Sequence, residues 1–127
     1  MKTRIVLLLS IAMLSFACKH TKIAEKTTGP VVTTYRAIVS FGSAGSGIDG
    51  QTLASLQSYI ISFGKTEGVT LSYDKVPWGK EGEIDYCFPL SEISKGKQGD
   101  FVNGLKNLTK SAKGVSVIEN SACTHKK

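Results

Sequence analysis

The chain contains 127 residues, of which 41% are hydrophobic and 20% are charged. This length fits one domain and excludes a multidomain enzyme, while the composition is globular rather than disordered, collagen-like or coiled-coil. The formal net charge is +6. The lysines are scattered instead of gathering on a helix face beside aromatic residues, so the sequence does not predict nucleic-acid binding.

The first 17 residues have the pattern of a secretory signal peptide. Lys2 and Arg4 precede an apolar run over residues 5–14, and small residues follow before Cys18. A run of about ten residues is too short for a membrane span, which needs about 20 helical residues. Removal of residues 1–17 would lower the formal charge from +6 to +4, because two basic residues and no acidic residue would leave.

The sequence Leu14-Ser-Phe-Ala-Cys18 resembles the relaxed lipobox of small Bacteroidota lipoproteins of unknown role. The resemblance implies that Cys18 is lipidated and anchors the protein in a membrane, and several acyl chains on one residue make such an anchor stable. Residues 18–32 are then the lipidated cysteine and a flexible polar tether. By analogy with lipoprotein sorting, Lys19 indicates the outer membrane of a Gram-negative bacterium. The alternative is an ordinary secreted protein that keeps a cysteine thiol at this position.

Residues 33–127 are expected to form one domain, and its first half predicts a strand followed by a helix. Apolar residues alternate with other side chains from Tyr35 to Phe41, as in a strand. After a glycine- and serine-rich loop, Asp49 is placed to cap a helix and Gly64 to end it. Apolar side chains recur along this helix at a spacing that puts them on one face: Leu53, Leu56, Ile60 and Phe63.

The second half predicts two strands, a helix and a last strand. Alternation predicts strands over residues 69–74 and 84–88, joined as a hairpin through residues 77–82. A helix is expected around residues 98–112, although Gly99 and Gly104 each cost it about 1 kcal/mol relative to alanine. Gly114 would end this helix, and residues 115–118 would form a short strand. The apolar stripe of the helix would contain Phe101, Leu105, Leu108 and Ala112.

The resulting order, β-α-β-β-α-β, predicts an α+β fold of the ferredoxin-like type, a two-layer sandwich in which two helices cover one face of a four-stranded antiparallel sheet. Right-handed crossovers put the first and third strands at the centre. The helix-covered face would carry Val39, Phe41, Leu71, Ile84, Tyr86 and Val117. The open face would carry Arg36, Ile38, Ser40, Ser72, Asp74, Asp85, Cys87 and Ile118.

The cysteines predict one crosslink. With Cys18 assigned to lipid, Cys87 and Cys123 remain as a pair in an oxidising compartment, where disulfides persist. The predicted third and fourth strands run parallel on either side of the first, which brings both cysteines toward the same edge. A closed loop of about 37 residues would stabilise the fold by roughly 3 to 4 kcal/mol.

A metal site is the alternative use of these cysteines. Cys123-Thr-His125 could place two ligands near Cys87, and Asp85 could add another. A single Cys-x-His sequence lacks the paired spacing of recognisable zinc sites. We therefore predict no metal and no cofactor, and keep a metal- or small-ligand-binding domain as the second hypothesis.

The sequence Gly45-Ser-Gly47-Ile-Asp-Gly50 matches the GxGxxG fingerprint of dinucleotide-binding folds. The chain continues with a hairpin instead of further parallel strands, and capping by Asp49 would occupy the amides that an anion needs. A flexible crossover loop is the preferred interpretation, with a smaller anion or a glycan as the alternative ligand.

Polar groups that would suit catalysis are sparse. Glu81, Glu83 and Asp85 recur at every second residue, which indicates a solvated strand face more than acid–base chemistry. The two histidines, His20 and His125, fall in the tether and the tail, where neither suits a triad that needs a rigidly held base.

Partner binding is the remaining function that the sequence favours. Trp78, the only tryptophan, lies in the hairpin connection and either packs there or anchors a partner or a sugar ring. Arg36 is expected to pair with Asp85 across neighbouring strands. The expected protein is a non-enzymatic envelope lipoprotein, attached to the membrane by its lipid, that contacts an envelope protein or glycan through Trp78, Arg36 and Asp85.

Overall fold

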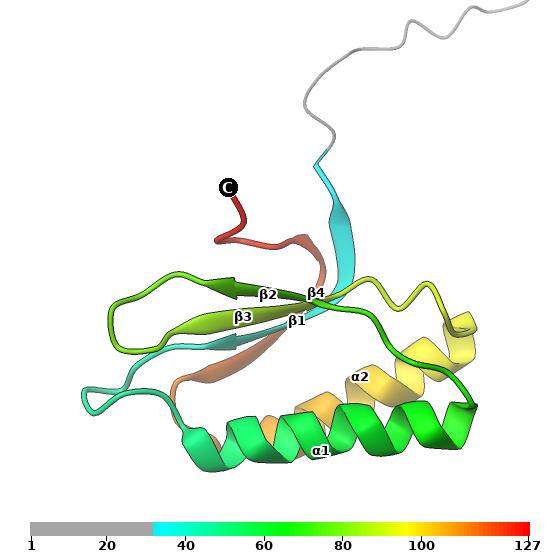
Figure 1. The fold of residues 1–127 in the computed structure, drawn as a ribbon, viewed down its shortest axis with the longest axis horizontal. Coiled ribbons are helices and arrows are strands. Elements are labelled where there is room, and N and C mark those ends of the chain that lie inside the picture. Colours follow the sequence, from blue (N-terminus) through cyan, green and yellow to red (C-terminus); the bar gives the residue numbers. More distant parts are fainter. Residues whose placement is uncertain (1–31) are drawn as a thin grey trace, which may run out of the picture.

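The computed structural model describes residues 32–127, which form four strands and two helices (Figure 1). Along the chain these are β1 (Thr34–Phe41), α1 (Gly50–Glu67), β2 (Asp74–Pro77), β3 (Ile84–Phe88), α2 (Lys95–Thr109) and β4 (Val115–Ala122). The predicted signal peptide, Cys18, His20 and the predicted tether up to residue 31 lie outside the described residues. Neither helix of residues 32–127 is long and apolar enough to cross a membrane.

The strands form one sheet in the order β2-β3-β1-β4, and every neighbouring pair is antiparallel. Both helices lie on the same face of this sheet, as Figure 1 shows. The predicted α+β sandwich, with β1 and β3 at its centre, is therefore confirmed. The core between the helices and the sheet contains Val39, Phe41, Leu56, Leu71, Tyr86, Phe101 and Leu105, all of them buried.

Helix α1 begins where the sequence predicts but ends one turn later. The Asp49 carboxylate accepts a hydrogen bond from the Thr52 amide at 2.9 Å and caps the first turn. The helix stops at Gly68, which has a left-handed φ of 69°, so the prediction that Gly64 ends it is wrong. Gly64 is buried within the helix, where a Cβ atom would lie 2.7 Å from the Val69 carbonyl oxygen. Glycine is therefore needed at position 64 because the Val69 carbonyl lies close to the helix there, and not because the helix ends there.

The second strand is displaced from its predicted position. The ladder with β3 begins at Asp74 and ends at Pro77, whereas alternation predicts residues 69–74. The Val69 amide donates to the Gly64 carbonyl, and Leu71 is buried in the core. The alternating pattern here therefore reflects a segment that packs beside α1 outside the ladder. The third strand, β3, matches its predicted bounds.

Helix α2 and β4 are also displaced. Helix α2 begins after Ser94 and ends at Thr109, so Ala112 lies outside it and Gly114 does not end it. Gly114 has a φ of 70° in the turn before β4, where its carbonyl accepts from the Gly42 amide at 2.7 Å. Strand β4 continues to Ala122, four residues further than predicted.

The face of the sheet opposite the helices is partly covered, contrary to the prediction that it is open. The chain after β4 turns back across this face (Figure 1), and we call residues 123–127 the C-terminal segment. Beneath it Ile38, Asp85 and Cys87 are fully buried. Ile38 and Cys87 join Tyr35 and Cys123 in a second, smaller apolar cluster. Ile118, at the outer strand, stays exposed.

Candidate functional site

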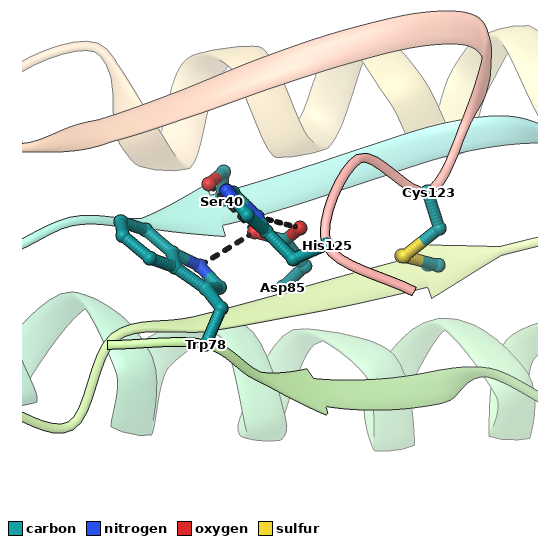
Figure 2. Close-up of polar contacts among 6 residues, drawn as sticks. Ser40, Trp78, Asp85, Cys123 and His125 are labelled. Carbon is teal, nitrogen blue, oxygen red and sulfur yellow. Dashed lines mark hydrogen bonds and ion pairs between the residues drawn. A yellow bond between two sulfur atoms is a disulfide. The ribbon is translucent and has the colours of Figure 1, made fainter. Parts of the chain in front are cut away.

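A disulfide joins Cys87 in β3 to Cys123 at the start of the C-terminal segment, with 6.0 Å between their Cα atoms (Figure 2). The predicted pairing is therefore present. Because β3 and β4 both run antiparallel to β1, they are parallel to each other, and β4 delivers Cys123 to the end of the sheet where Cys87 lies. The crosslink holds the C-terminal segment against β3.

Asp85 is the buried polar centre of the site. Its Oδ1 atom accepts hydrogen bonds from the Ser40 hydroxyl at 2.7 Å and from the Trp78 indole nitrogen at 3.0 Å. Its Oδ2 atom lies 2.7 Å from Nδ1 of His125 (Figure 2). The three partners come from β1, the hairpin and the C-terminal segment. Asp85 is 0% exposed, and the hydrogen bonds to these three side chains replace those that its carboxylate would make with water.

Trp78 and His125, both bound to Asp85, stack on each other at the surface. Their ring centroids are 4.2 Å apart and their planes differ by 15°. Trp78 is 40% exposed and the His125 side chain 34%, so both remain accessible. We call this stacked pair and the groove beside it the Trp78–His125 site. The groove is lined by Pro77, Trp78, Thr124, His125, Lys126 and Lys127.

Lys126 provides a second attachment of the C-terminal segment. Its Nζ atom lies 2.6 Å from a carboxylate oxygen of Asp74 and 2.7 Å from the Tyr35 hydroxyl, which also donates to Asp74. The hydrogen bond to Asp74, followed by that to Tyr35, raises the pKa of Lys126 to about 12. The same contacts, with Lys126 first, hold the pKa of Asp74 below its usual value.

Arg36 lies elsewhere, and its predicted pairing with Asp85 is wrong. In the register of the sheet Ser40 stands opposite Asp85, and Arg36 is four residues further along β1, or about 13 Å away. Its guanidinium contacts Glu119 at 2.7 Å, and Glu119 also pairs with Lys106 of α2. Arg36 and Asn120 are not paired in the ladder between β1 and β4, and Asn120 has a φ of 50°. At this break the side chain of Arg36 turns toward the face of the sheet that the helices cover, where Glu119 lies.

The three alternating acidic residues do not form one solvated face. Glu81 lies in the exposed connection and accepts from the Ser43 hydroxyl. The Glu83 carboxylate accepts from the Glu81 amide at 2.8 Å, while Asp85 is buried in β3. The period of two is lost because the connection between β2 and β3 turns before Glu83, so these groups have separate roles.

The glycine-rich loop satisfies its own amides. The Gly45 and Gly47 amides donate to the Ser43 hydroxyl oxygen at 3.2 and 3.3 Å, and both glycines have positive φ. Asp49 occupies the first turn of α1. These contacts favour the structural interpretation of the GxGxxG sequence over an anion site.

The hydrogen bonds at Asp85 orient side chains and do not create a nucleophile. A catalytic triad needs a hydroxyl or thiol bound to the histidine, whereas the Ser40 hydroxyl donates to the carboxylate itself. Within residues 32–127 no serine, threonine or cysteine side chain is hydrogen-bonded to His125. A carboxylate and two sulfur atoms do gather here, because ligand atoms of Asp85, Cys87 and Cys123 lie within 4.8 Å of one another.

The preferred interpretation of the sequence leaves His125 in the tail without a fixed position, whereas the metal-site alternative puts it near Cys87 and Asp85, where the structure has it. A signal for its position exists in the spacing. Asp85 and Cys87 are two residues apart on one face of β3, and Cys123 and His125 are also two apart. The Cys87–Cys123 disulfide therefore also brings Asp85 and His125 together.

Comparisons with protein-family models, with curated protein sequences and with solved structures find no match to this chain.

Proposed function

We propose that this protein is a lipid-anchored envelope protein whose folded domain is a non-enzymatic binding module. Support for the anchor comes from the sequence alone. A charged start and a short apolar run precede Cys18, and a polar segment separates Cys18 from the first strand. A tether of this kind would let the domain reach partners near the membrane surface, and the outer membrane is the proposed location.

The single observation that carries the binding role is the fixed aromatic pair above Asp85. The buried carboxylate hydrogen-bonds to Trp78 and contacts His125, so both rings are held in place before any partner arrives. Preorganised side chains lose little conformational entropy on binding, and exposed tryptophans are frequent hot spots of interfaces. The buried Asp85 supports this surface from below, and Arg36, engaged with Glu119, lies outside it.

The charge of the groove indicates the chemistry of the partner. Lys126 and Lys127 lie beside the two rings, and Lys126 also forms an ion pair with Asp74. A flat aromatic surface with ammonium groups at its rim suits a partner that presents an acidic group next to an apolar or ring-shaped one. We propose an acidic component of the envelope, and the experiment below separates protein from glycan.

The binding role is tested with Trp78→Ala in the full chain, expressed in the native envelope. The wild-type protein, crosslinked and purified, is expected to carry a partner adduct that Trp78→Ala loses. Ile61→Ala is the matched control, because Ile61 is also a large exposed apolar residue but lies on α1, on the other side of the sheet. Protease or muramidase treatment of the adduct identifies protein or glycan. Equal adducts in wild type and Trp78→Ala would refute the proposal.

The anchor is tested separately with Cys18→Ser. Wild-type protein is expected to incorporate labelled palmitate and to fractionate with membranes, and the variant to do neither. Retention of the label in Cys18→Ser would exclude Cys18 as the attachment point, without bearing on the Trp78–His125 site.

A further inference from the structure

The disulfide lies within a set of side chains that are typical metal ligands. The carboxylate of Asp85 and the sulfurs of Cys87 and Cys123 lie within 4.8 Å of one another, and Nδ1 of His125 is 2.7 Å from Asp85 Oδ2. Two cysteines, a histidine and a carboxylate match the donors that zinc takes in four-coordinate sites. In the oxidised protein the sulfur atoms are bonded to each other, so their thiolates are not available.

We propose that reduction of the Cys87–Cys123 disulfide turns this cluster into a Zn²⁺ site. Its ligands are the two sulfurs, one oxygen of Asp85 and Nδ1 of His125. This site goes beyond the partner-binding function: it shares Asp85 and His125 with the Trp78–His125 site but forms only in the reduced protein, whereas the partner is bound by the outer surface of the oxidised one.

The chemistry balances with a dithiol as the reductant. The dithiol gives two electrons and two protons and closes into its own disulfide, while the Cys87–Cys123 bond breaks into two thiols. Zn²⁺ then displaces one proton from each thiol and binds the thiolates. His125 coordinates as the neutral ring, with its proton on Nε2 instead of Nδ1.

The geometry requires only short movements. Bond lengths of about 2.3 Å to sulfur and 2.0 Å to nitrogen or oxygen place tetrahedral ligand atoms roughly 3.3 to 3.8 Å apart. Asp85 and Cys87 are fixed on one face of β3, because they are two residues apart in a strand. Cys123 and His125 belong to the C-terminal segment beyond β4, so separating the two sulfurs breaks no strand pairing.

The surroundings of Asp85 provide a supporting shell for a metal. Ser40 and Trp78 both bind Oδ1, which orients the carboxylate and leaves Oδ2 toward His125. Hydrogen bonds of this kind to a ligating carboxylate are a regular feature of protein metal sites. Asp85 and Cys87 are fully buried and Cys123 is 5% exposed, so the site excludes most water.

The test uses the full chain with Cys18→Ser, which leaves two thiols, reduced with a phosphine and titrated with Co²⁺. We expect one Co²⁺ per chain, with a thiolate-to-cobalt charge-transfer band and the intense visible bands of tetrahedral Co²⁺, all displaced by Zn²⁺. The oxidised protein is expected to show none of these bands. Zn²⁺ is expected to raise the Tm of the reduced protein and leave that of the oxidised protein unchanged.

Variants assign the ligands. Cys87→Ser or Cys123→Ser leaves one thiolate and should at least halve the charge-transfer band per bound Co²⁺, and His125→Ala should weaken Co²⁺ binding at least tenfold. His20→Ala, at the other histidine of the chain, is the control and should bind as the parent does. The proposal is overturned if the reduced parent shows no charge-transfer band at equimolar Co²⁺, if His125→Ala binds as tightly, or if the reduced chain unfolds and Zn²⁺ does not restore its circular-dichroism spectrum. These readouts need no partner, so they fail or succeed independently of the crosslinking experiment.

Discussion

Asp85 shows what residue patterns can and cannot predict. Its place on the face away from the helices follows from strand alternation and is predicted correctly. Its burial does not follow, because it depends on His125, which is 40 residues away along the chain. The same holds for Arg36, whose partner is set by the register of β1 against β4 rather than by its neighbours in sequence. Long-range pairing of single side chains is therefore the part of the site that the sequence leaves open.

Asp85→Asn tests the role of the buried carboxylate. Asparagine has the shape of aspartate but carries no charge. One of the two oxygen acceptors is replaced by an NH₂ donor, which then faces one of the groups that bind Asp85. Because hydrogen bonds to a charged group contribute about 1.5 to 3 kcal/mol, we expect a loss of about 2 to 3 kcal/mol in unfolding free energy, measured by urea denaturation. Asp100→Asn, at an exposed carboxylate on α2, is the control and should change stability by less than about 0.5 kcal/mol. Equal effects of the two substitutions would contradict the role assigned to Asp85.

The contact between Lys126 and Asp74 predicts a pH dependence at both extremes. Lys126 has its pKa raised to about 12, so its contribution is complete below its ordinary value of 10.5 and is lost as pH rises through about 12. The pKa of Asp74 is lowered, so its contribution is present above the ordinary value of 3.8 and is lost as pH falls through the folded value. We expect NMR shifts of the residue 124–126 amides to change in acid in the wild type. Asp74→Asn should remove this transition, and its persistence would refute the assignment.

At the scale of elements, glycines explain where the predicted bounds fail. Gly64 fits a helix stop by residue type, yet α1 passes through it because the Val69 carbonyl approaches that point. Gly104 likewise lies within α2, where the Tyr59 ring occupies the space of a side chain and its hydroxyl donates to the Phe101 carbonyl. The residue type alone does not tell whether a glycine is needed because another group packs closely against it or because the chain turns there. Element types were therefore predictable, whereas several of their ends, such as those of α1 and α2, were not.

Two substitutions distinguish these uses of glycine. Gly64→Ala puts a methyl group 2.7 Å from the Val69 carbonyl oxygen, and crowding of this kind typically costs about 1 to 3 kcal/mol. Gly99→Ala, inside α2 with open space at its Cβ position, should instead stabilise by about 0.5 to 1 kcal/mol, since alanine favours a helix. Urea unfolding followed by circular dichroism measures both. A stabilising Gly64→Ala would show that the segment after α1 can move aside.

At the scale of the whole molecule, the order of elements predicts the sandwich because each element must bury one apolar face against another. The disulfide is also predictable, since β3 and β4 run parallel on either side of β1 and bring Cys87 and Cys123 to the same end of the sheet. The covering of the second sheet face is not predictable from periodicity, because the C-terminal segment is polar and has no regular structure. Its position results from the crosslink, from Asp85 and from Lys126 acting together.

Replacing both cysteines, as Cys87→Ala with Cys123→Ala, tests how far the crosslink holds this segment. Without it the unfolded chain regains the freedom of a loop of about 37 residues, so we expect a loss of roughly 3 to 4 kcal/mol in unfolding free energy by urea denaturation. The C-terminal segment should also separate from β3 more often, which would part His125 from Trp78. Because Trp78 is the only tryptophan, its fluorescence reports on this contact directly.

His125→Ala, with the disulfide intact, separates the two effects. It removes the ring stacked on Trp78 but keeps the closed loop, so its fluorescence should change about as much as that of the double cysteine variant. Its stability should fall by less, because only the contact with Asp85 and the stacking are lost. If the double cysteine variant lost stability but kept the wild-type emission of Trp78, the contacts of His125 and Lys126 alone would hold the C-terminal segment in place. The crosslink would then stabilise the domain without shaping the Trp78–His125 site.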